Sequence, residues 1–508
     1  MRSWGIGFGL PDLLHPDEPA YVLQALAVAA RLPNGLTFAN PPLFKYLLLA
    51  EYAADYGLHR MLGISASPQD FLAQFRADPS ELYLIARVSS ALIGAATAVG
   101  AYALGTEVGG RGVGAIAAWL TAVAYLLVRD AHFGVDDGLV TLLVTIGLVF
   151  CVRIARGGTR RDYAAGGALA GLAFAAKYDG IALLAPLLLA HALRGTDRKR
   201  ADLAISAAVC VAAAVVAFPS MLSEPGRVIQ DVYLHLYLGA TGGYDGLDPA
   251  GGYLFYGKSL LRGLGWPLVI VVAAGLLMTA IKRNRPLLVV GALPLSMIVV
   301  LGAQQLYFAR FLLPTLPALL VIAAAPLERL WAIRPVLGLS VALVVAVPTL
   351  VDAVRFDVLL TRQDTRRQAA DWVVARLPPD ALLAADGPPL GPPLAVRGAR
   401  VLEGTEGALF DLSPAEYRVR GVEYVVASSF TSEVHAIDPD REARRLAFYA
   451  QLARDAEVVA EFRPYAGNDA PAFAYDQIYG PFNGLDALER PGPTVTIYRF
   501  NFELGTPP

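Results

Sequence analysis

The sequence predicts a mostly α-helical, multi-pass membrane protein with a small α/β domain at its C-terminal end. Of its 508 residues, 56% are hydrophobic and 17% are charged, whereas about a quarter of the residues of soluble domains are charged. Apolar runs of nearly membrane-spanning length recur from residue 82 to residue 353, and beyond residue 354 charges become frequent. We therefore divide the chain into a transmembrane domain, 1–353, and a soluble domain, 354–508.

Ten segments have the apolar character of membrane spans. They lie at about 82–104, 112–128, 138–155, 162–178, 180–194, 202–220, 266–281, 287–303, 310–327 and 336–353. Several are shorter than the roughly 20 residues that a spanning helix needs. The pattern is least regular around Lys177-Tyr178-Asp179, which favours a broken or re-entrant helix at that point.

The segment before the spans, 15–80, mixes short apolar pieces with Pro, Asp and Gly. It predicts a large first loop whose short helices lie at the membrane interface. One of them opens at Asn40-Pro41-Pro42-Leu43-Phe44-Lys45, where the prolines stand at positions that a helix start tolerates.

Cationic residues gather in loops that the ten spans place on one side of the membrane. The clusters are Arg153, Arg156, Arg160 and Arg161; Arg194, Arg198, Lys199 and Arg200; Lys282, Arg283 and Arg285; and Arg329 and Arg334. The positive-inside rule makes that side cytoplasmic. The first loop, the other polar clusters and the C-terminal domain are then expected outside the cytoplasm.

The C-terminal domain shows alternating helix and strand signals. Residues 363–377 and 440–455 predict helices, and Val422–Val426, Glu457–Phe462 and Thr494–Phe500 predict strands. Asp438-Pro439-Asp440 has the form of a metal-binding Asp-x-Asp motif, but its place before a helix favours a helix cap.

Some classes of protein are disfavoured. With a net charge of −2, the chain lacks the basic character expected of a nucleic-acid-binding protein. Cys151 and Cys210 lie in apolar runs, as small packing residues do, and no zinc-type spacing occurs.

Carboxylates stand in two of the loops expected outside. Asp17 and Glu18 precede an apolar helical pattern, where acids are also favoured by the helix dipole alone. Asp136 and Asp137 open the span at 138–155, close to Arg129 and His132. The alternative for this second pair is a helix cap with a dipole-favoured acid, but ionisable groups near a membrane are costly and usually functional.

Three cations stand near the outer ends of spans: Lys177, Arg310 and Arg87. The alternatives are a snorkelling lysine and arginines that only anchor helix ends. Tyrosines at 233, 237, 244, 253 and 256 enrich the loop 221–262; they fit an interfacial aromatic belt or a surface that stacks on sugars or isoprenoid chains.

Asp17-Glu18, Pro41-Pro42-Leu43-x-Lys45 and a later Asp in an outer loop resemble the membrane glycosyltransferases of the C-type fold. Ala309-Arg310-Phe311-Leu312-Leu313-Pro314 and the helix that opens at Asp364-Thr365-Arg366-Arg367 also resemble them. The nearest relatives by this resemblance are the protein O-mannosyltransferases and the lipid A aminoarabinose transferases. Such enzymes move a sugar, with inversion, from a polyprenyl-phosphate carrier to an acceptor outside the membrane.

The resemblance implies roles for several residues. Asp17 matches the catalytic acid of the first loop, with Glu18 beside it, and Asp136 matches the acid of the second. Lys177 matches a basic residue that could hold the carrier phosphate. Family members also carry a transmembrane helix before the Asp-Glu pair, so we expect about 15–20 further apolar residues upstream of Met1.

The chemistry suits these residue types. The transfer needs a base for the acceptor proton and cations near the departing phosphate. Arg310 and Arg87 are therefore candidates for binding the donor phosphate together with Lys177. His132, Asp137, Lys45 and Tyr307 are further candidates for substrate binding. The scheme demands no metal, although Asp136 and Asp137 could hold Mg²⁺ or Mn²⁺.

The expected partners are a polyprenyl-phosphate-linked sugar, a lipid, glycan or protein acceptor hydroxyl, and membrane lipids. The alternative from another class is a transporter or flippase with the outer carboxylates as ion sites. The break at Lys177 favours it, but no internal repeat of the kind common in transporters occurs. A third alternative, a structural assembly protein, has no specific support in the sequence.

Overall fold

The computed structural model describes residues 1–32, 35–195, 199–241, 245–247, 251–402, 408–467 and 470–501. Arg198 of the second cationic cluster and Tyr244 of the aromatic loop lie outside these ranges. The chain divides into two compact units. The first contains Met1–Ile6, Ala20–Gly242 and Ala250–Val354, and the second contains Gly7–Pro19, Gly243–Pro249 and Arg355–Pro508.

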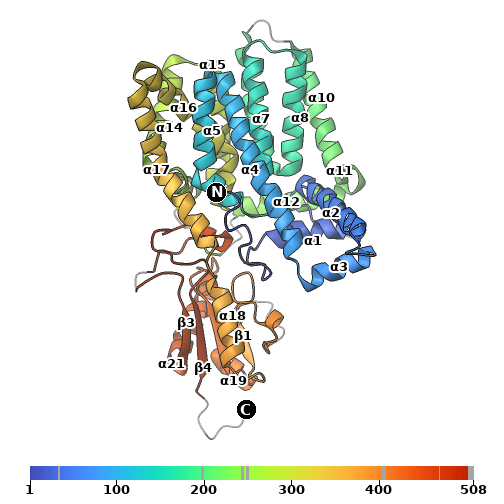
Figure 1. The fold of residues 1–508 in the computed structure, drawn as a ribbon, viewed down its shortest axis with the longest axis vertical. Coiled ribbons are helices and arrows are strands. Elements are labelled where there is room, and N and C mark those ends of the chain that lie inside the picture. The colour runs from blue at the N-terminus through green and yellow to red at the C-terminus, as the bar shows by residue number, and fades with distance from the viewer. Residues whose placement is uncertain are drawn as a thin grey trace. The chain divides into compact units, whose positions relative to one another are not determined.

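The described residues of the first unit form helices joined by turns and loops, without a β-strand (Figure 1). Its helices are α1 (Glu18–Ala29), α2 (Leu43–Met61), α3 (Pro68–Ala77), α4 (Ser80–Gly109), α5 (Arg111–Val123), α6 (Tyr125–Asp130), α7 (Asp137–Ala155), α8 (Arg160–Ala176), η1 (Tyr178–Leu183), α9 (Leu184–Leu193), α10 (Arg200–Ala217), α11 (Ser220–Ser223), α12 (Pro225–Thr241), α13 (Gly252–Leu264), α14 (Trp266–Lys282), α15 (Arg285–Gly302), η3 (Ala309–Thr315), α16 (Leu316–Ile333) and α17 (Pro335–Leu360). Helices α1 and α17 each cross from one unit into the other.

The ten segments predicted as spans fall on helices of this unit. Among the described residues, six helices are long and apolar enough to cross a membrane, or seven if one bent pair counts as a single span. The chain is therefore a multi-span membrane protein. The helices α5 and α9 are shorter apolar pieces, and α9 is separated from α8 by the break at Lys177 that the sequence suggested.

Burial separates the spans that line the core of the unit from those at its rim. Helix α16 is buried from Leu316 to Ala325 and packs against α5, α14 and α15, as a helix that is hydrophobic all round should. Helix α10 packs mainly on α8 and leaves Val211 and Val216 63% and 81% exposed. Such apolar exposure suits contact with lipid.

The segment 221–262, predicted as a loop between spans, is mostly helical. It contains the helices α12 and α13. Helix α13 meets α14 at a bend of 112°. Gly265 makes the bend, with φ 76°, and a Cβ there would lie 2.8 Å from the Pro348 side chain. Only glycine combines this backbone conformation with that close approach.

The second unit contains a four-stranded sheet. Its strands are β1 (Leu383–Ala385), β2 (Tyr424–Ser428), β3 (Ala456–Phe462) and β4 (Val495–Phe500), in the order β1-β2-β4-β3. The β1–β2 pair is parallel, and the β2–β4 and β3–β4 pairs are antiparallel. Three of the strands were predicted within two residues, and β1 was not predicted because its three residues carry too short a pattern.

Helices cover both faces of this sheet (Figure 1). Val426 and Ile497 pack with Ala369, Ala370 and Val373 of α18 (Thr365–Arg376). The neighbouring positions on β2 face the other side and pack with side chains of α19 (Pro414–Val419) and α21 (Pro439–Asp455). This alternation explains why all five β2 residues are buried.

Both predicted helices of this domain are confirmed. Asp364 caps α18 by accepting a hydrogen bond from the Arg366 backbone N–H at 2.9 Å. Asp438 caps α21 in the same way, through the Asp440 N–H at 3.1 Å. The helix-cap interpretation of Asp438-Pro439-Asp440 is therefore confirmed.

One buried acid should make the stability of this domain depend on pH. Asp386 is 7% exposed, its Oδ2 accepts a hydrogen bond from the Ser428 N–H at 2.8 Å, and burial raises its pKa to about 7. The unfolded pKa is about 3.9, so the stabilisation from this group is complete below that pH and is lost as the pH rises through about 7. Asp386→Asn should therefore reduce the loss of stability between pH 5 and pH 8.

Hydrogen exchange of the β2 amides, corrected for intrinsic rates, measures this effect on the full-length protein. Asp380→Asn is the matched control, because Asp380 is exposed and its side chain should not influence the opening of the sheet. Equal pH dependence in the parent and the Asp386→Asn variant would contradict the assignment.

Candidate functional site

The two acids at the start of α7 do not form a simple helix cap. Asp136 occupies the capping position, but its side chain makes no cap hydrogen bond to the helix. Both Asp136 and Asp137 are buried, at 0% and 3% exposure. The cap interpretation is therefore wrong for Asp136, and the carboxylate is directed to another partner.

That partner is Lys177. Its ammonium forms an ion pair with Asp137 Oδ1 and lies 3.9 Å from Asp136 Oδ1. It also lies 4.9 Å from the centre of the Phe311 ring. Lys177 is only 9% exposed, so the snorkelling interpretation is wrong: the cation is held inside the unit.

The break between α8 and η1 places Lys177 there. Helix α8 ends at Ala176, and Lys177 takes an extended conformation, with φ −156° and ψ 140°. Gly180 then packs on α8 so closely that a Cβ would lie 2.4 Å from the Ala173 backbone. The glycine therefore permits the tight return of the chain that leaves Lys177 facing the start of α7.

Arg310 and Asp179 complete the charged cluster. The Arg310 guanidinium lies 4.4 Å from the centre of the Phe308 ring and 5.7 Å from that of Phe311, and its charge acts on both Lys177 and Asp130. Asp179 is also within electrostatic reach of Lys177. Sequence reasoning singled out Arg310 but not Asp179 or Asp130, although both stand in segments it had marked.

Lys45 is a second buried cation near this cluster. Its ammonium donates hydrogen bonds to the carbonyl oxygens of Thr37 and Asn40, at 2.9 and 3.0 Å. Burial lowers the pKa of Lys45 to about 8, and the charges of Asp136 and Asp231 oppose the shift. Lys45 thus lies within electrostatic reach of the acids that open α7, and Asp231 is a further acid that the sequence did not signal.

Three other predicted residues have structural partners. Arg87 is buried and donates to the Ile6 carbonyl oxygen at 2.8 Å. The His132 ring contacts the carbonyl oxygens of Val128 and Trp4, at 2.8 and 3.1 Å. The Tyr307 ring packs 5.0 Å from that of Phe255. Arg87 and His132 thereby hold the first residues of the chain.

The pair Asp17-Glu18 belongs to the junction between the Gly7–Pro19 segment and α1. The backbone N–H groups of Asp17 and Glu18 both donate to His15 Nδ1, at 3.2 and 3.3 Å. Glu18 is buried in the first turn of α1, as the helix-dipole interpretation predicted. Asp17 stands directly before the helix and is partly exposed.

Arginines of the C-terminal domain hold the Gly7–Pro19 segment in the second unit. Arg366 is paired with Asp364 and donates to the Leu14 carbonyl oxygen at 3.1 Å. The Asp12 carboxylate forms ion pairs with Arg367 and Arg397, with N–O distances of 3.1 and 3.0 Å. The helix that opens at Asp364 therefore fixes the segment that leads to Asp17.

The structure thus brings Asp136, Asp137, Lys177 and Arg310 together in the first unit, while Asp17 and Glu18 are fixed with the second unit at its junction with α1. The Lys177 ammonium lies against both acids at the start of α7. Among the described residues, the group of His, Cys, Asp and Glu side chains with the spacing of a metal site is Asp55, His59 and Glu81.

Comparisons with known proteins agree with the predicted fold. A family model described as dolichyl-phosphate-mannose-protein mannosyltransferase matches residues 82–222. The structure of ArnT from Cupriavidus metallidurans bound to undecaprenyl phosphate is similar with a TM-score of 0.54 and 15% identity, over 99% of this chain and 97% of that one. The structure of the same protein in the apo state is similar with a TM-score of 0.54 and 16% identity, over 90% of this chain and 94% of that one. No curated relative matches the sequence.

At these identities the structural likeness establishes the fold. The predicted class is confirmed: the chain is a mostly helical, multi-pass membrane protein of the C-type glycosyltransferase fold with a small C-terminal α/β region. The resemblance drawn from short sequence motifs is confirmed with it.

Proposed function

We propose that this protein transfers a sugar from a polyprenyl-phosphate carrier to an acceptor hydroxyl, with inversion, on the outer face of the membrane. The fold is shared with ArnT, which was solved with undecaprenyl phosphate bound, and the family model that matches residues 82–222 describes mannosyl transfer from dolichyl phosphate. The observation that carries the proposal is the buried ammonium of Lys177 at a helix break, beside Arg310.

The proposed reaction is a single displacement. The acceptor oxygen attacks the anomeric carbon, the bond from that carbon to the phosphate oxygen breaks, and the acceptor proton passes to a carboxylate base. Asp17 is assigned as this base, with Glu18 as its neighbour, on the resemblance that the sequence shows. Loss of basicity at such a position costs about 10²–10⁴-fold in rate.

Lys177 and Arg310 are assigned to the phosphate. The departing polyprenyl phosphate gains negative charge as the sugar leaves, so cations that are already in place stabilise the transition state. A lysine ammonium has three N–H donors. Lys177 can therefore keep its ion pair with Asp137 and still donate to a phosphate oxygen, while the cluster of acids orients it.

Purified protein incubated with a labelled polyprenyl-phosphate sugar tests the function. We expect free polyprenyl phosphate to be released only when a membrane extract supplies an acceptor. A series of hexose and pentose donors, aminoarabinose included, then identifies the sugar. Movement of the intact lipid-linked sugar across a vesicle membrane without cleavage would contradict the proposal and support the flippase alternative, which the break at Lys177 had suggested.

The orientation of the protein is a separate prediction. Since the four cationic clusters follow the positive-inside rule, the domain after residue 354 should lie outside the cytoplasm. A reporter fused after Pro508 that is active only in an oxidising compartment should be active, and a strictly cytoplasmic reporter should be silent. The opposite result would reverse the topology and remove the proposed outer-face site.

A further inference from the structure

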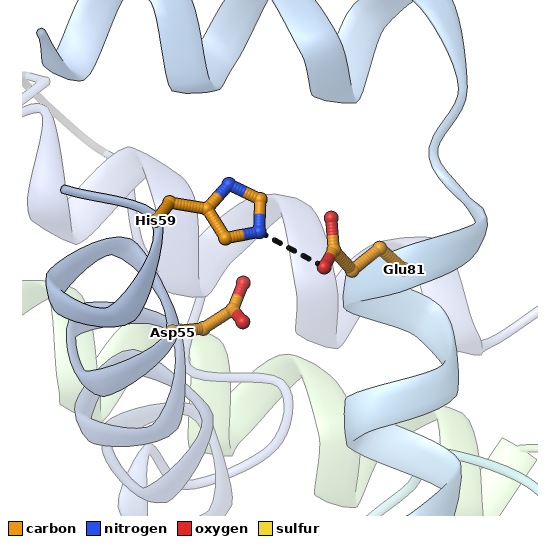
Figure 2. A group of neighbouring side chains, drawn as sticks. All are labelled: Asp55, His59 and Glu81. Atoms are coloured by element: carbon orange, nitrogen blue, oxygen red, sulfur yellow. Dashed lines mark hydrogen bonds and ion pairs between the residues drawn. The ribbon is translucent and has the colours of Figure 1, made fainter. Parts of the chain in front are cut away.

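A group of metal-binding side chains lies away from the candidate site, where α2 meets the start of α4. Asp55 and His59 stand one turn apart on α2, and Glu81 stands in the first turn of α4. Figure 2 shows that the three head groups point toward a common space. One ligand atom from each lies within 4.8 Å of the others, and His59 Nε2 lies 3.1 Å from Glu81 Oε1.

The hydrogen bonds behind His59 select the form of its ring. Gln74 Nε2 donates to the Ile64 carbonyl oxygen at 3.1 Å, so the other end of that amide, Oε1, can only accept. The Ser65 hydroxyl donates its one proton to Gln74 Oε1, at 3.0 Å. The same hydroxyl must therefore accept the hydrogen bond from His59 Nδ1, at 3.3 Å. A neutral His59 ring then carries its proton on Nδ1 and turns the bare lone pair of Nε2 toward Glu81.

A bare Nε2 and a carboxylate oxygen 3.1 Å apart repel each other unless a positive charge lies with them. The charge is either a proton shared between the two side chains or a metal ion. A partner on the far nitrogen that fixes the tautomer is the usual support of a metal-ligating histidine. His59 is 7% exposed, so its ring is held in this orientation by packing as well.

The surrounding cleft favours a cation. It has a volume of about 790 Å³ and is lined by four carboxylates, those of Glu51, Asp55, Asp78 and Glu81, with no Lys or Arg among its lining residues. Two oxygens are buried without a hydrogen-bond partner among the described residues, Asp55 Oδ2 and Glu51 Oε2. Buried, unpaired carboxylate oxygens are costly, and a bound cation would compensate that cost.

We propose that Asp55, His59 and Glu81 bind one divalent transition-metal ion, of which Zn²⁺ is the best match, and that this ion joins α2 to α4. One imidazole nitrogen with two carboxylate oxygens is a donor set that zinc accepts, whereas Ca²⁺ and Mg²⁺ prefer oxygen donors alone. Ligand atoms around a tetrahedral zinc lie about 3.3 Å apart, given bonds of about 2.0–2.1 Å. The His59–Glu81 pair has this spacing, and rotation of the Asp55 side chain supplies the third ligand.

The proposal is independent of the glycosyltransferase assignment, and metal binding itself tests it. Full-length protein, freed of any polyhistidine tag and of metal, is titrated with Zn²⁺ by calorimetry and with Co²⁺ by visible absorption. We expect one equivalent at micromolar or lower dissociation constant, with cobalt bands of a four- or five-coordinate site. Absence of a stoichiometric site in the parent protein would overturn the proposal.

Variants locate the site. His59→Ala should abolish the stoichiometric binding, Asp55→Asn should weaken it at least tenfold, and Ser65→Ala should weaken it about 10–100-fold through loss of the support of the ring. His435→Ala is the matched control, since His435 is an exposed histidine paired with Glu442, and it should bind like the parent. Because Asp55→Asn and Ser65→Ala are conservative, retained parental affinity in both would overturn the proposal even if His59→Ala fails to fold.

Discussion

Asp17→Asn should lower the rate of sugar transfer about 10²–10⁴-fold while the binding of the polyprenyl-phosphate donor is retained. Asparagine keeps the size of the side chain but cannot accept the acceptor proton. The hydrogen bonds that His15 receives here come from the backbone N–H groups of residues 17 and 18, so the substitution leaves them in place. Single-turnover rates with labelled donor, beside donor binding measured at equilibrium, separate the two quantities.

Glu18→Gln is the matched control, because it neutralises the neighbouring acid, which is buried in the first turn of α1. Its turnover should stay well above that of Asp17→Asn. Loss of turnover in Glu18→Gln alone would move the role of base to Glu18. If both variants stay within about threefold of the parent, neither acid is the base, since loss of a general base costs far more.

Those parts of the fold that depend on long local patterns could be predicted from the sequence. Apolar runs located the helices, and the frequent charges after residue 354 located the sheet-containing region. The helices α12 and α13 both carry an amphipathic helical pattern, but they were missed because the segment was interpreted from its aromatic and glycine content. Strand β1 was missed because its pairing with β2 comes from the tertiary fold and not from its three residues.

The candidate site could likewise be predicted where it depends on local sequence patterns, but not where it depends on the tertiary fold. The break at Lys177 and the acids of 136 and 137 were visible as local irregularities, but their ion pair joins residues 40 positions apart. The contact of Arg366 with Leu14 spans 352 positions, so the helix at Asp364 could be predicted while its contacts with the Gly7–Pro19 segment could not. Asp55 and His59 have the i, i+4 spacing of a metal pair, yet Glu81 completes the group only through the packing of α2 on α4.

Lys177→Ala should lower both donor affinity and rate. A hydrogen bond to a charged group contributes about 1.5–3 kcal/mol, which corresponds to about 10–150-fold in affinity. Loss of a donor that stabilises developing charge costs about a further 10²–10³-fold in turnover. Lys177→Arg keeps the positive charge and should recover part of the donor affinity. Filter binding of labelled donor and single-turnover transfer measure the two effects.

The main competing explanation is that removal of Lys177 leaves the Asp137 carboxylate buried without its partner, which alone is strongly destabilising. The double variant Lys177→Ala/Asp137→Asn removes that unpaired charge as well. If Lys177 only neutralises the acids of α7, the double variant should regain stability and transfer together. If Lys177 binds the carrier phosphate, the double variant should regain stability, measured by thermal unfolding in detergent, while donor affinity and turnover remain low, because no cation has replaced the one that the phosphate requires.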